Sequence, residues 1–233
     1  MALTDQAIAK IKDLIVDGEF GPGSKLPKEK ELAEQLGLSR NSLREAVRAL
    51  TLVGVLEPRQ GDGTYVTSLE PDLLLAGTSF VSDLLTGPTI LELYQVRRIL
   101  EPAATALAAP RLTDEDLSAL QDCLRRMDAA DTTQCFIDAD VEFHRIIVTA
   151  CGNATLASLI QNLSGGTLRA RIWRAIQEQG SIDSTRAMHH DIFYALAARD
   201  AELAAAADLA HLAAGERWFR GMLAAEAATG NGA

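Results

Sequence analysis

Residues 26–66 of the chain read LPKEKELAEQLGLSRNSLREAVRALTLVGVLEPRQGDGTYV. Apolar residues recur at helical spacing on both sides of Gly37, which predicts two short helices joined by a tight turn. Ser39 stands where its hydroxyl can cap the second helix. Two short strands, 56–58 and 64–66, are expected to pair around a glycine-flanked turn. Together these signals predict a helix-turn-helix followed by a β-hairpin.

The second of these helices has two chemically different faces. Leu43 and Leu50 belong to an apolar face, whereas Arg40, Arg44 and Arg48 recur every four residues on another. A helix of this kind fits the major groove of DNA, because an arginine can bridge guanine O6 and N7 with two hydrogen bonds. The β-hairpin would then form a wing whose glycines let the backbone approach the sugar-phosphate chain.

The same stretch resembles the winged helix-turn-helix of GntR-family bacterial transcription regulators, over about forty consecutive residues without a gap. The resemblance implies three helices and a β-hairpin that bind DNA. The positions that it assigns to DNA contact are Lys30, Ser39, Arg40, Asn41, Ser42, Arg44, Arg48, Gly61 and Gly63.

Three residues depart from the family pattern. Lys28 stands where a capping serine is usual, which predicts a less firmly started helix. Lys30 replaces an arginine and keeps the charge but loses the planar fork. Asp62 lies at the wing tip, where its carboxylate would repel phosphate, so we expect no phosphate contact there. The alternative to a DNA-binding element is a helical hairpin with a solvated basic face.

The net charge of −10 is unevenly distributed along the 233 residues. Residues 1–68 hold 9 of the 22 Lys and Arg residues and 10 of the 32 Asp and Glu residues. The acidic excess therefore lies almost entirely in residues 69–233. A nearly neutral front segment predicts modest affinity for DNA in general. Tight binding would then require two copies acting together.

Composition also indicates the compartment. The chain has no run of eighteen apolar residues, which argues against a membrane span, and its first helix is amphipathic rather than a signal peptide. Cys123, Cys135 and Cys151 are scattered and odd in number, as expected for reduced thiols in a cytoplasmic protein.

The pattern of helix signals predicts a mainly α fold in two domains. Residues 1–68 form the winged helix-turn-helix, 69–77 a linker, and 78–228 an all-α antiparallel bundle of six or seven helices. Gly165 and Gly166 are expected to kink or break one of these helices. Residues 229–233 are expected to be a disordered tail.

Four polar residues of the second domain are expected to converge. Asp140 and His144 share a helix face at four-residue spacing. His189 lies on the apolar face of its helix, unlike its neighbour His190, and His211 lies on the inner face of the last helix. Three imidazoles and one carboxylate make a site for a divalent transition metal with open positions. Spacing alone leaves open the alternative of hydrogen-bonded core histidines.

Three stretches of the second domain resemble the FCD effector domain found in the FadR subfamily of GntR regulators: ELYQVRRILEPAATALAA (92–109), DADVEFHRIIVTACGN (138–153) and HHDIFYALAARDAELAAAADLAH (189–211). The resemblance selects Asp140, His144, His189 and His211 as metal ligands. It implies zinc, nickel or manganese, a small carboxylate metabolite as effector, and Arg97 as a contact for that effector.

Arg97 could instead pair with Glu101 or Glu92 on its own helix. Arg169, Arg171 and Arg174 are further candidates for an anion contact, although three arginines on one helix commonly form a solvated face.

These features predict a ligand-responsive transcription regulator, a repressor, that binds palindromic operator DNA as a homodimer. Alternatively, the metal itself is the signal and the protein is a metal sensor. A metalloenzyme with a DNA-binding tether is disfavoured because no unassigned acid or base accompanies the histidines. We therefore expect no enzymatic activity.

Overall fold

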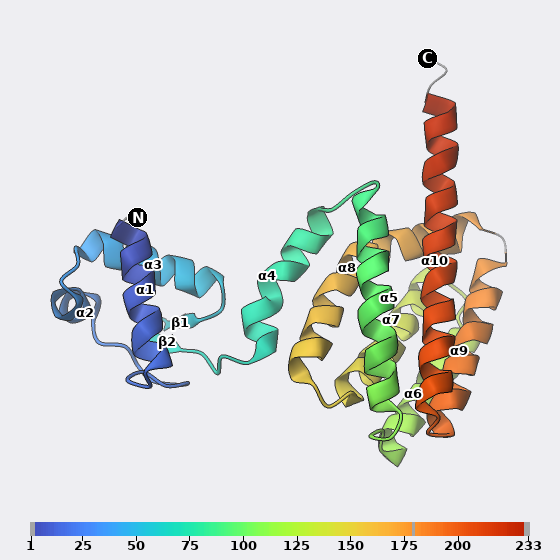
Figure 1. The fold of residues 1–233 in the computed structure, drawn as a ribbon, viewed down its shortest axis with the longest axis horizontal. Helices are drawn as coiled ribbons and strands as arrows, with labels where there is room; N and C mark the ends of the chain where they lie inside the picture. The colour runs from blue at the N-terminus through green and yellow to red at the C-terminus, as the bar shows by residue number, and fades with distance from the viewer. Residues whose placement is uncertain (1–2, 179, 231–233) are drawn as a thin grey trace. The chain divides into compact units, whose positions relative to one another are not determined.

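In the computed structural model the chain is mainly helical and divides after Gly77 into two compact units. The structure describes residues 3–178 and 180–230. Figure 1 shows the order of the elements along the chain, and each unit is described by itself below. None of the described helices combines the length and apolarity needed to cross a membrane.

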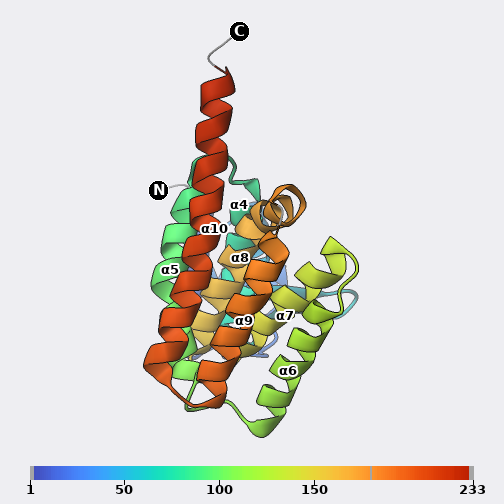
Figure 2. The same ribbon diagram turned by 90° about the vertical axis from the view of Figure 1, so that its right-hand side faces the viewer.

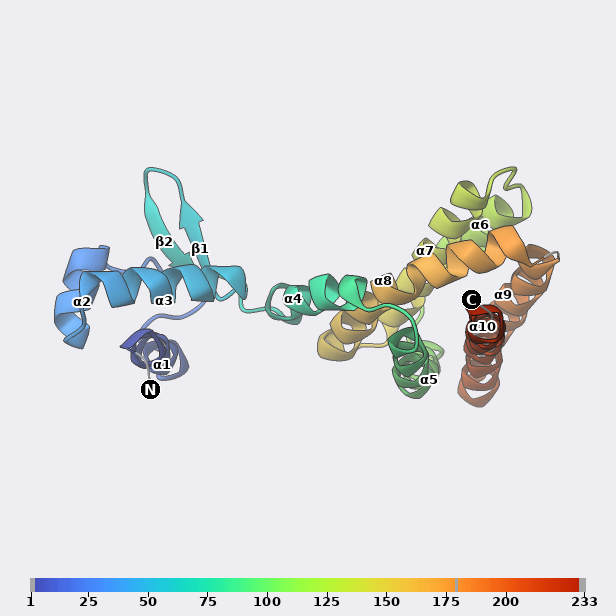
Figure 3. The ribbon, with the colours of Figure 1, turned by 90° about the horizontal axis from the view of Figure 1, so that it is seen from above.

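The first unit contains three helices and a two-stranded antiparallel sheet. Its elements are α1 (Leu3–Val16), α2 (Glu29–Leu36), α3 (Arg40–Leu52), β1 (Leu56–Arg59) and β2 (Gly63–Val66). Leu56 pairs with Val66 and Arg59 with Gly63, so the hairpin turns over the three residues 60–62. Figure 3 shows this hairpin projecting as a ribbon from the helices, as expected for a wing.

Local signals account for the helix ends of this unit. Gly37 has a φ of 64°, in the left-handed region that a residue behind a helix end often needs. The Ser39 hydroxyl accepts the backbone N–H of Ser42 at 3.0 Å, which caps α3. Lys28 makes no side-chain cap for α2, as its position in the sequence predicts.

The segment predicted as a linker is helical over most of its length. Residues 71–77 form the first half of α4 (Pro71–Leu84), within which the boundary between the two units falls. Proline suits the first position of a helix because its fixed φ is already helical, and Asp72 in the first turn complements the helix dipole. The connection is therefore a helix rather than an irregular segment.

The second unit is an antiparallel bundle with one large apolar core and a smaller apolar cluster between α5, α8 and α10. It continues from α4 through α5 (Thr89–Ala108), α6 (Asp114–Asp128), α7 (Thr133–Ala150), α8 (Ala154–Gln177), α9 (Ser181–Ala197) and α10 (Ala201–Gly230). Figures 1 and 2 both show α5, α9 and α10 running side by side. Phe143 and Ile192, from α7 and α9, are fully buried at its centre.

The C-terminal residues are only partly described. α10 extends to Gly230, so Thr229 and Gly230 are helical rather than part of a disordered tail. Residues 231–233 lie outside the described part of the chain.

The sequence predicts a kink or a break at Gly165 and Gly166. The structure excludes the break, because α8 continues without interruption to Gln177. A Cβ on residue 166 would lie 2.6 Å from both Leu93 Cδ1 and the Ser82 carbonyl oxygen. The Ser82 hydroxyl also donates to the carbonyl oxygen of Asn162 at 2.9 Å. Gly166 is therefore needed for the close approach of α4 and α5 to α8, and its cost to helix propensity is offset by this packing.

We expect Gly166→Ala to destabilise the helical unit by about 1–3 kcal/mol, because the added methyl group overlaps a backbone carbonyl that cannot move freely. Urea unfolding followed by tryptophan fluorescence measures this unit, since Trp173 and Trp218 both lie in it.

Gly221→Ala is the matched control. A Cβ there meets no atom within 4 Å, so alanine should be neutral or stabilise the protein by up to about 1 kcal/mol. Equal stability of the Gly166→Ala protein and the wild type would contradict the packing argument.

Candidate nucleic-acid interface and candidate metal centre

The candidate DNA-binding surface of the first unit is one exposed face of α3. Arg40, Arg44 and Arg48 are all exposed on it. Arg44 Nε lies 3.3 Å from Glu29 Oε2, and Arg48 Nη1 lies 2.9 Å from Glu45 Oε1. Ion pairs between exposed side chains contribute at most about 1 kcal/mol. Both arginines can therefore exchange these carboxylates for phosphate or base acceptors.

The other residues selected from the sequence are not all equally accessible. Lys30, Ser39, Asn41 and Gly61 are exposed, and Gly63 is half-buried. Ser42 is buried, and its hydroxyl lies 2.8 Å from that of Ser39. Ser42 thus takes part in the cap of α3, and its hydroxyl faces Ser39 and not the exposed surface predicted to contact DNA.

The wing tip is held by a contact that sequence analysis missed. Lys25 Nζ lies 2.5 Å from Asp62 Oδ1, and the Tyr65 hydroxyl donates to Asp62 Oδ2 at 2.5 Å. The guanidinium of Arg59 covers the Tyr65 ring at 4.1 Å from its centroid. The hydrogen bond from Lys25 lowers the pKa of the Asp62 carboxyl. The carboxylate expected to repel phosphate is thus neutralised by a lysine from before α2.

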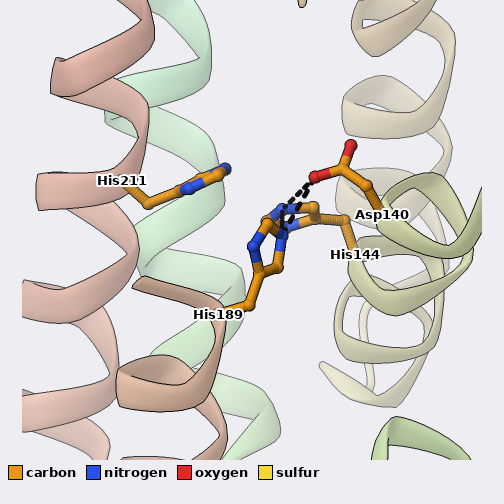
Figure 4. Close-up of side chains that lie close together, drawn as sticks. All are labelled: Asp140, His144, His189 and His211. Atoms are coloured by element: carbon orange, nitrogen blue, oxygen red, sulfur yellow. Dashed lines mark hydrogen bonds and ion pairs between the residues drawn. The ribbon is translucent and has the colours of Figure 1, made fainter. Parts of the chain in front are cut away.

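The candidate metal centre lies in the second unit, where the four residues predicted as ligands come together. Asp140 and His144 project from α7, His189 from α9 and His211 from α10 (Figure 4). One ligand atom from each residue lies within 4.8 Å of the others. His189 Nε2 is 2.9 Å from Asp140 Oδ1 and 3.2 Å from His144 Nε2. Figure 4 also shows the tip of the His211 ring pointing towards the other three.

His189 shows how the helix backbone prepares one ligand. Its Nδ1 lies 2.7 Å from the carbonyl oxygen of Thr185, which can only accept, so Nδ1 carries a proton. Its Nε2 then faces an Asp140 oxygen and a second ring nitrogen. Two acceptors thus face Nε2, and a positive centre between them would be favourable. A metal cation can supply that positive centre.

The protonation states of the other residues also suit a metal. Burial lowers the pKa of His144 to about 3 and the pKa of His211 well below its ordinary value, so both rings are neutral. Burial opposes ionisation of Asp140, but the charge of Arg171 and a hydrogen bond from His189 hold its pKa well below the usual range. Neutral imidazoles and an ionised carboxylate are the donor set that a divalent transition metal prefers. The residues therefore fit such an ion.

Two arginines adjoin this centre, of which Arg97 is buried and Arg171 half-buried. Arg97 is 2% exposed, its Nε and Nη2 donate to both oxygens of Glu101 at 2.5 and 3.2 Å, and its Nη1 donates to Thr167 Oγ1 at 2.6 Å. The predicted effector contact is thus bound along its whole fork by partners within the protein. Arg171 donates through Nη1 to Asp140 Oδ2, and its buried Nε has no hydrogen-bond partner among the described residues.

Two cavities in the second unit adjoin these guanidinium groups. One of about 40 Å³ is lined by Asp140, His211, Arg97 and Arg171. Another of about 180 Å³ is lined by His144, the same two arginines and the polar side chains of Gln161 and Ser164.

Sequence analysis did not single out Glu101 or Asp208 as parts of this site. An oxygen of each lies within 4.8 Å of the other and of a His144 ring nitrogen. Burial and the charge of Glu101 raise the pKa of Asp208 to about 7. The spacing of Glu101 predicts its pairing with Arg97, which the structure shows, but not its place beside the metal centre. Asp208 lies among the alanines of α10 and has no recognisable spacing signal. His190, expected at the edge of the bundle, pairs there with Asp128 at 3.2 Å.

Comparison with known proteins now identifies the chain. Residues 3–66 match the family described as "Bacterial regulatory proteins, gntR family", and residues 92–214 match the FCD domain. The chain belongs to the GntR family of bacterial transcription regulators and carries an FCD domain. Its fold, with a small β-hairpin after the helix-turn-helix, confirms the predicted mainly α fold class.

Relatives of this GntR regulator match over nearly all of its length. The HTH-type transcriptional regulator LutR of Bacillus subtilis is 33% identical over 205 residues, covering 85% of this chain and 93% of LutR. The galactonate operon transcriptional repressor of Escherichia coli is 28% identical, covering 92% and 95%. The structure of a Streptococcus agalactiae GntR protein has a TM-score of 0.62 at 29% identity, covering 92% and 99%. These relatives are transcription regulators rather than enzymes.

Acidification should destabilise the helical unit in the presence of a chelator. The unfolded chain protonates His144 near pH 6.5, whereas the native protein does so only near 3, so stability falls as the pH decreases between these values. Each buried neutral histidine contributes a slope of up to about 1.4 kcal/mol per pH unit. Urea unfolding at several pH values, followed by tryptophan fluorescence, measures this slope.

In His144→Gln, the change of unfolding free energy with pH should be smaller by the contribution of one histidine, which is up to about 1.4 kcal/mol per pH unit. An identical pH dependence of stability in the variant and the wild type would contradict the assignment of His144 as a buried neutral base.

Proposed function

We propose that this GntR regulator responds to a small carboxylate through a divalent metal held by Asp140, His144, His189 and His211. The supporting observation is the convergence of three imidazoles and one carboxylate beside the guanidinium groups of Arg97 and Arg171. Zinc, nickel and manganese are the candidate ions, because imidazole and carboxylate donors suit each of them. Such an ion, when bound, supplies open coordination positions that attract a carboxylate oxygen.

Arg171 is the better placed anion contact of these two arginines. Each of the three guanidinium nitrogens of Arg97 donates a hydrogen bond to Glu101 or Thr167. In contrast, Arg171 Nε has no hydrogen-bond partner among the described residues. The Asp140 carboxylate that Arg171 holds is also a proposed metal ligand, so metal binding would weaken this pair and release a guanidinium edge. An incoming carboxylate can then bind that edge with two hydrogen bonds. Arg97 lines the same cavities and adds positive charge.

The larger cavity, of about 180 Å³, suits a small molecule. It opens to the surface beside the exposed Val141. Gln161 and Ser164 add neutral hydrogen-bonding groups, which suits an acid that also carries hydroxyl groups. Galactonate, in the name of one relative, is an acid of this chemical kind, and that relative is named as a repressor.

The first unit supplies DNA binding. Two copies paired through their bundles would present two α3 helices to a palindromic operator, as symmetric regulators do. An effector changes DNA affinity only if it binds the DNA-competent and the DNA-free state with different affinity. We assign the protein as a repressor that such an acid releases from its operator.

Replacement of Arg40 or Arg44, two of the three exposed arginines of α3, should remove most operator binding. Arg40→Ala and Arg44→Ala each delete a candidate base contact worth about 1–3 kcal/mol of discrimination. The measurement is a gel shift on DNA that the wild-type protein selects from a random pool, with circular dichroism to verify folding.

Arg125→Ala is the control, since Arg125 is an exposed arginine of the helical unit. It should bind the selected DNA like the wild type. Wild-type binding by both α3 variants would refute the assignment of α3 as the recognition helix.

Arg171→Lys should weaken the response to the effector. Lysine keeps the charge but loses the planar fork, so the acid concentration needed to release DNA should rise by about tenfold or more. Metal content and DNA affinity without acid should stay unchanged. The assay is release of operator DNA by a panel of small hydroxy acids at fixed metal concentration.

Arg169→Lys is the matched control on the same helix, because Arg169 is outside both cavities beside the metal centre and donates to the carbonyl oxygen of Asp83. An unchanged acid response in Arg171→Lys would exclude Arg171 as the anion contact. Switching of DNA binding by chelation and re-addition of metal, without any acid, would instead establish the metal as the signal.

A further inference from the structure

Asp208 is a buried acid that the proposed mechanism does not yet use. It lies in α10, is 1% exposed, and its Oδ2 accepts a hydrogen bond from Thr105 Oγ1 at 2.8 Å. Its other oxygen, Oδ1, is buried and has no hydrogen-bond partner in the described part of the chain. A buried acceptor without a partner is unfavourable, so a donor is expected to face it.

His211, three residues later on the same helix, also has a buried polar atom without a partner among the residues described. This atom is Nδ1 of its ring. Side chains three residues apart on a helix are neighbours on one face. Asp208 is directed towards the metal centre, because one of its oxygens lies within 4.8 Å of a ring nitrogen of His144. Within the described part of the chain, a carboxylate oxygen without a donor and a ring nitrogen without an acceptor therefore lie one helical turn apart on α10, both buried beside the metal centre.

Metal-bound histidines almost always donate their second N–H to a carboxylate, a carbonyl or water, which fixes the tautomer and the ring orientation. His189 has such an acceptor in the Thr185 carbonyl oxygen. Glu101 is the other nearby acid, but both of its oxygens already accept from Arg97. Asp208 Oδ1 is the carboxylate oxygen near the centre that remains available.

Resting on the proposed metal function, we propose that Asp208 is a positioning residue of the metal centre. Its Oδ1 accepts the Nδ1–H of His211, directly or through one water molecule, and so directs the Nε2 lone pair of His211 towards the cation. Thr105 holds the other carboxylate oxygen and thereby fixes the direction of Oδ1. Asp208 itself does not bind the metal.

The test is the affinity of the full-length protein for Zn²⁺, measured by competition with a chromogenic chelator. Asp208→Asn keeps the side-chain size and an oxygen for Thr105, but it removes the anionic acceptor. Zn²⁺ affinity should fall by about 10–100-fold. Glu216→Gln is the matched control, because Glu216 is a buried acid of the same helix that pairs with Arg98 and Arg220. Its Zn²⁺ affinity should equal that of the wild type.

A second measurement needs no variant. In the Zn²⁺-loaded wild type, ¹⁵N-edited NMR of the histidine rings should show His211 protonated at Nδ1, with an N–H that exchanges slowly with solvent. A His211 ring protonated at Nε2, or Zn²⁺ affinity of Asp208→Asn within twofold of the wild type, would overturn the role of Asp208 alone. Failure of the wild type to bind Zn²⁺ would overturn the proposed metal function together with this inference.

Discussion

The Asp140 carboxylate can remain ionised in the interior only because positive and hydrogen-bonding groups surround it. Its side chain is 2% exposed, and burial by itself would raise its pKa. Arg171 and His189 reverse that effect from two other helices. Removing one partner from such a buried group costs about 3–5 kcal/mol. The position of α7 relative to α8 and α9 therefore depends on this one carboxylate.

The same kind of constraint extends through the bundle. Arg97 joins α5 to α8 through Thr167, Arg171 joins α8 to α7 through Asp140, and Asp208 joins α10 to α5. Each contact joins two different helices within the close-packed apolar side chains of the bundle. Apolar packing would tolerate small shifts of one helix along another, whereas directional hydrogen bonds fix the register. A site built on such a network keeps its ligand atoms in place.

Much of this fold could be predicted from the sequence because its signals are local. Ser39, Thr113 and Asn153 cap α3, α6 and α8 as their positions indicate, and helical periodicity placed His189 inside and His190 at the edge. The roles of other residues depend on partners that no spacing rule relates to them.

Arg171 illustrates this limit. From the sequence it is one of three arginines on a helix, and only the fold brings it against Asp140, 31 residues away. Local signals also left open whether α8 kinks or breaks at its glycine pair, and the structure shows a continuous helix. In α8, tertiary contacts around Gly166 outweigh its low helix propensity.

The wing owes its shape to a glycine that admits a lysine. A Cβ on Gly63 would lie 2.8 Å from Lys25 Cε, so the lysine reaches Asp62 only because no side chain stands in its way. With Tyr65 on the other carboxylate oxygen, the tip is held from two sides before any duplex arrives. The loss of backbone freedom, about 1–2 kcal/mol for each residue ordered, thus occurs during folding and does not oppose association with DNA.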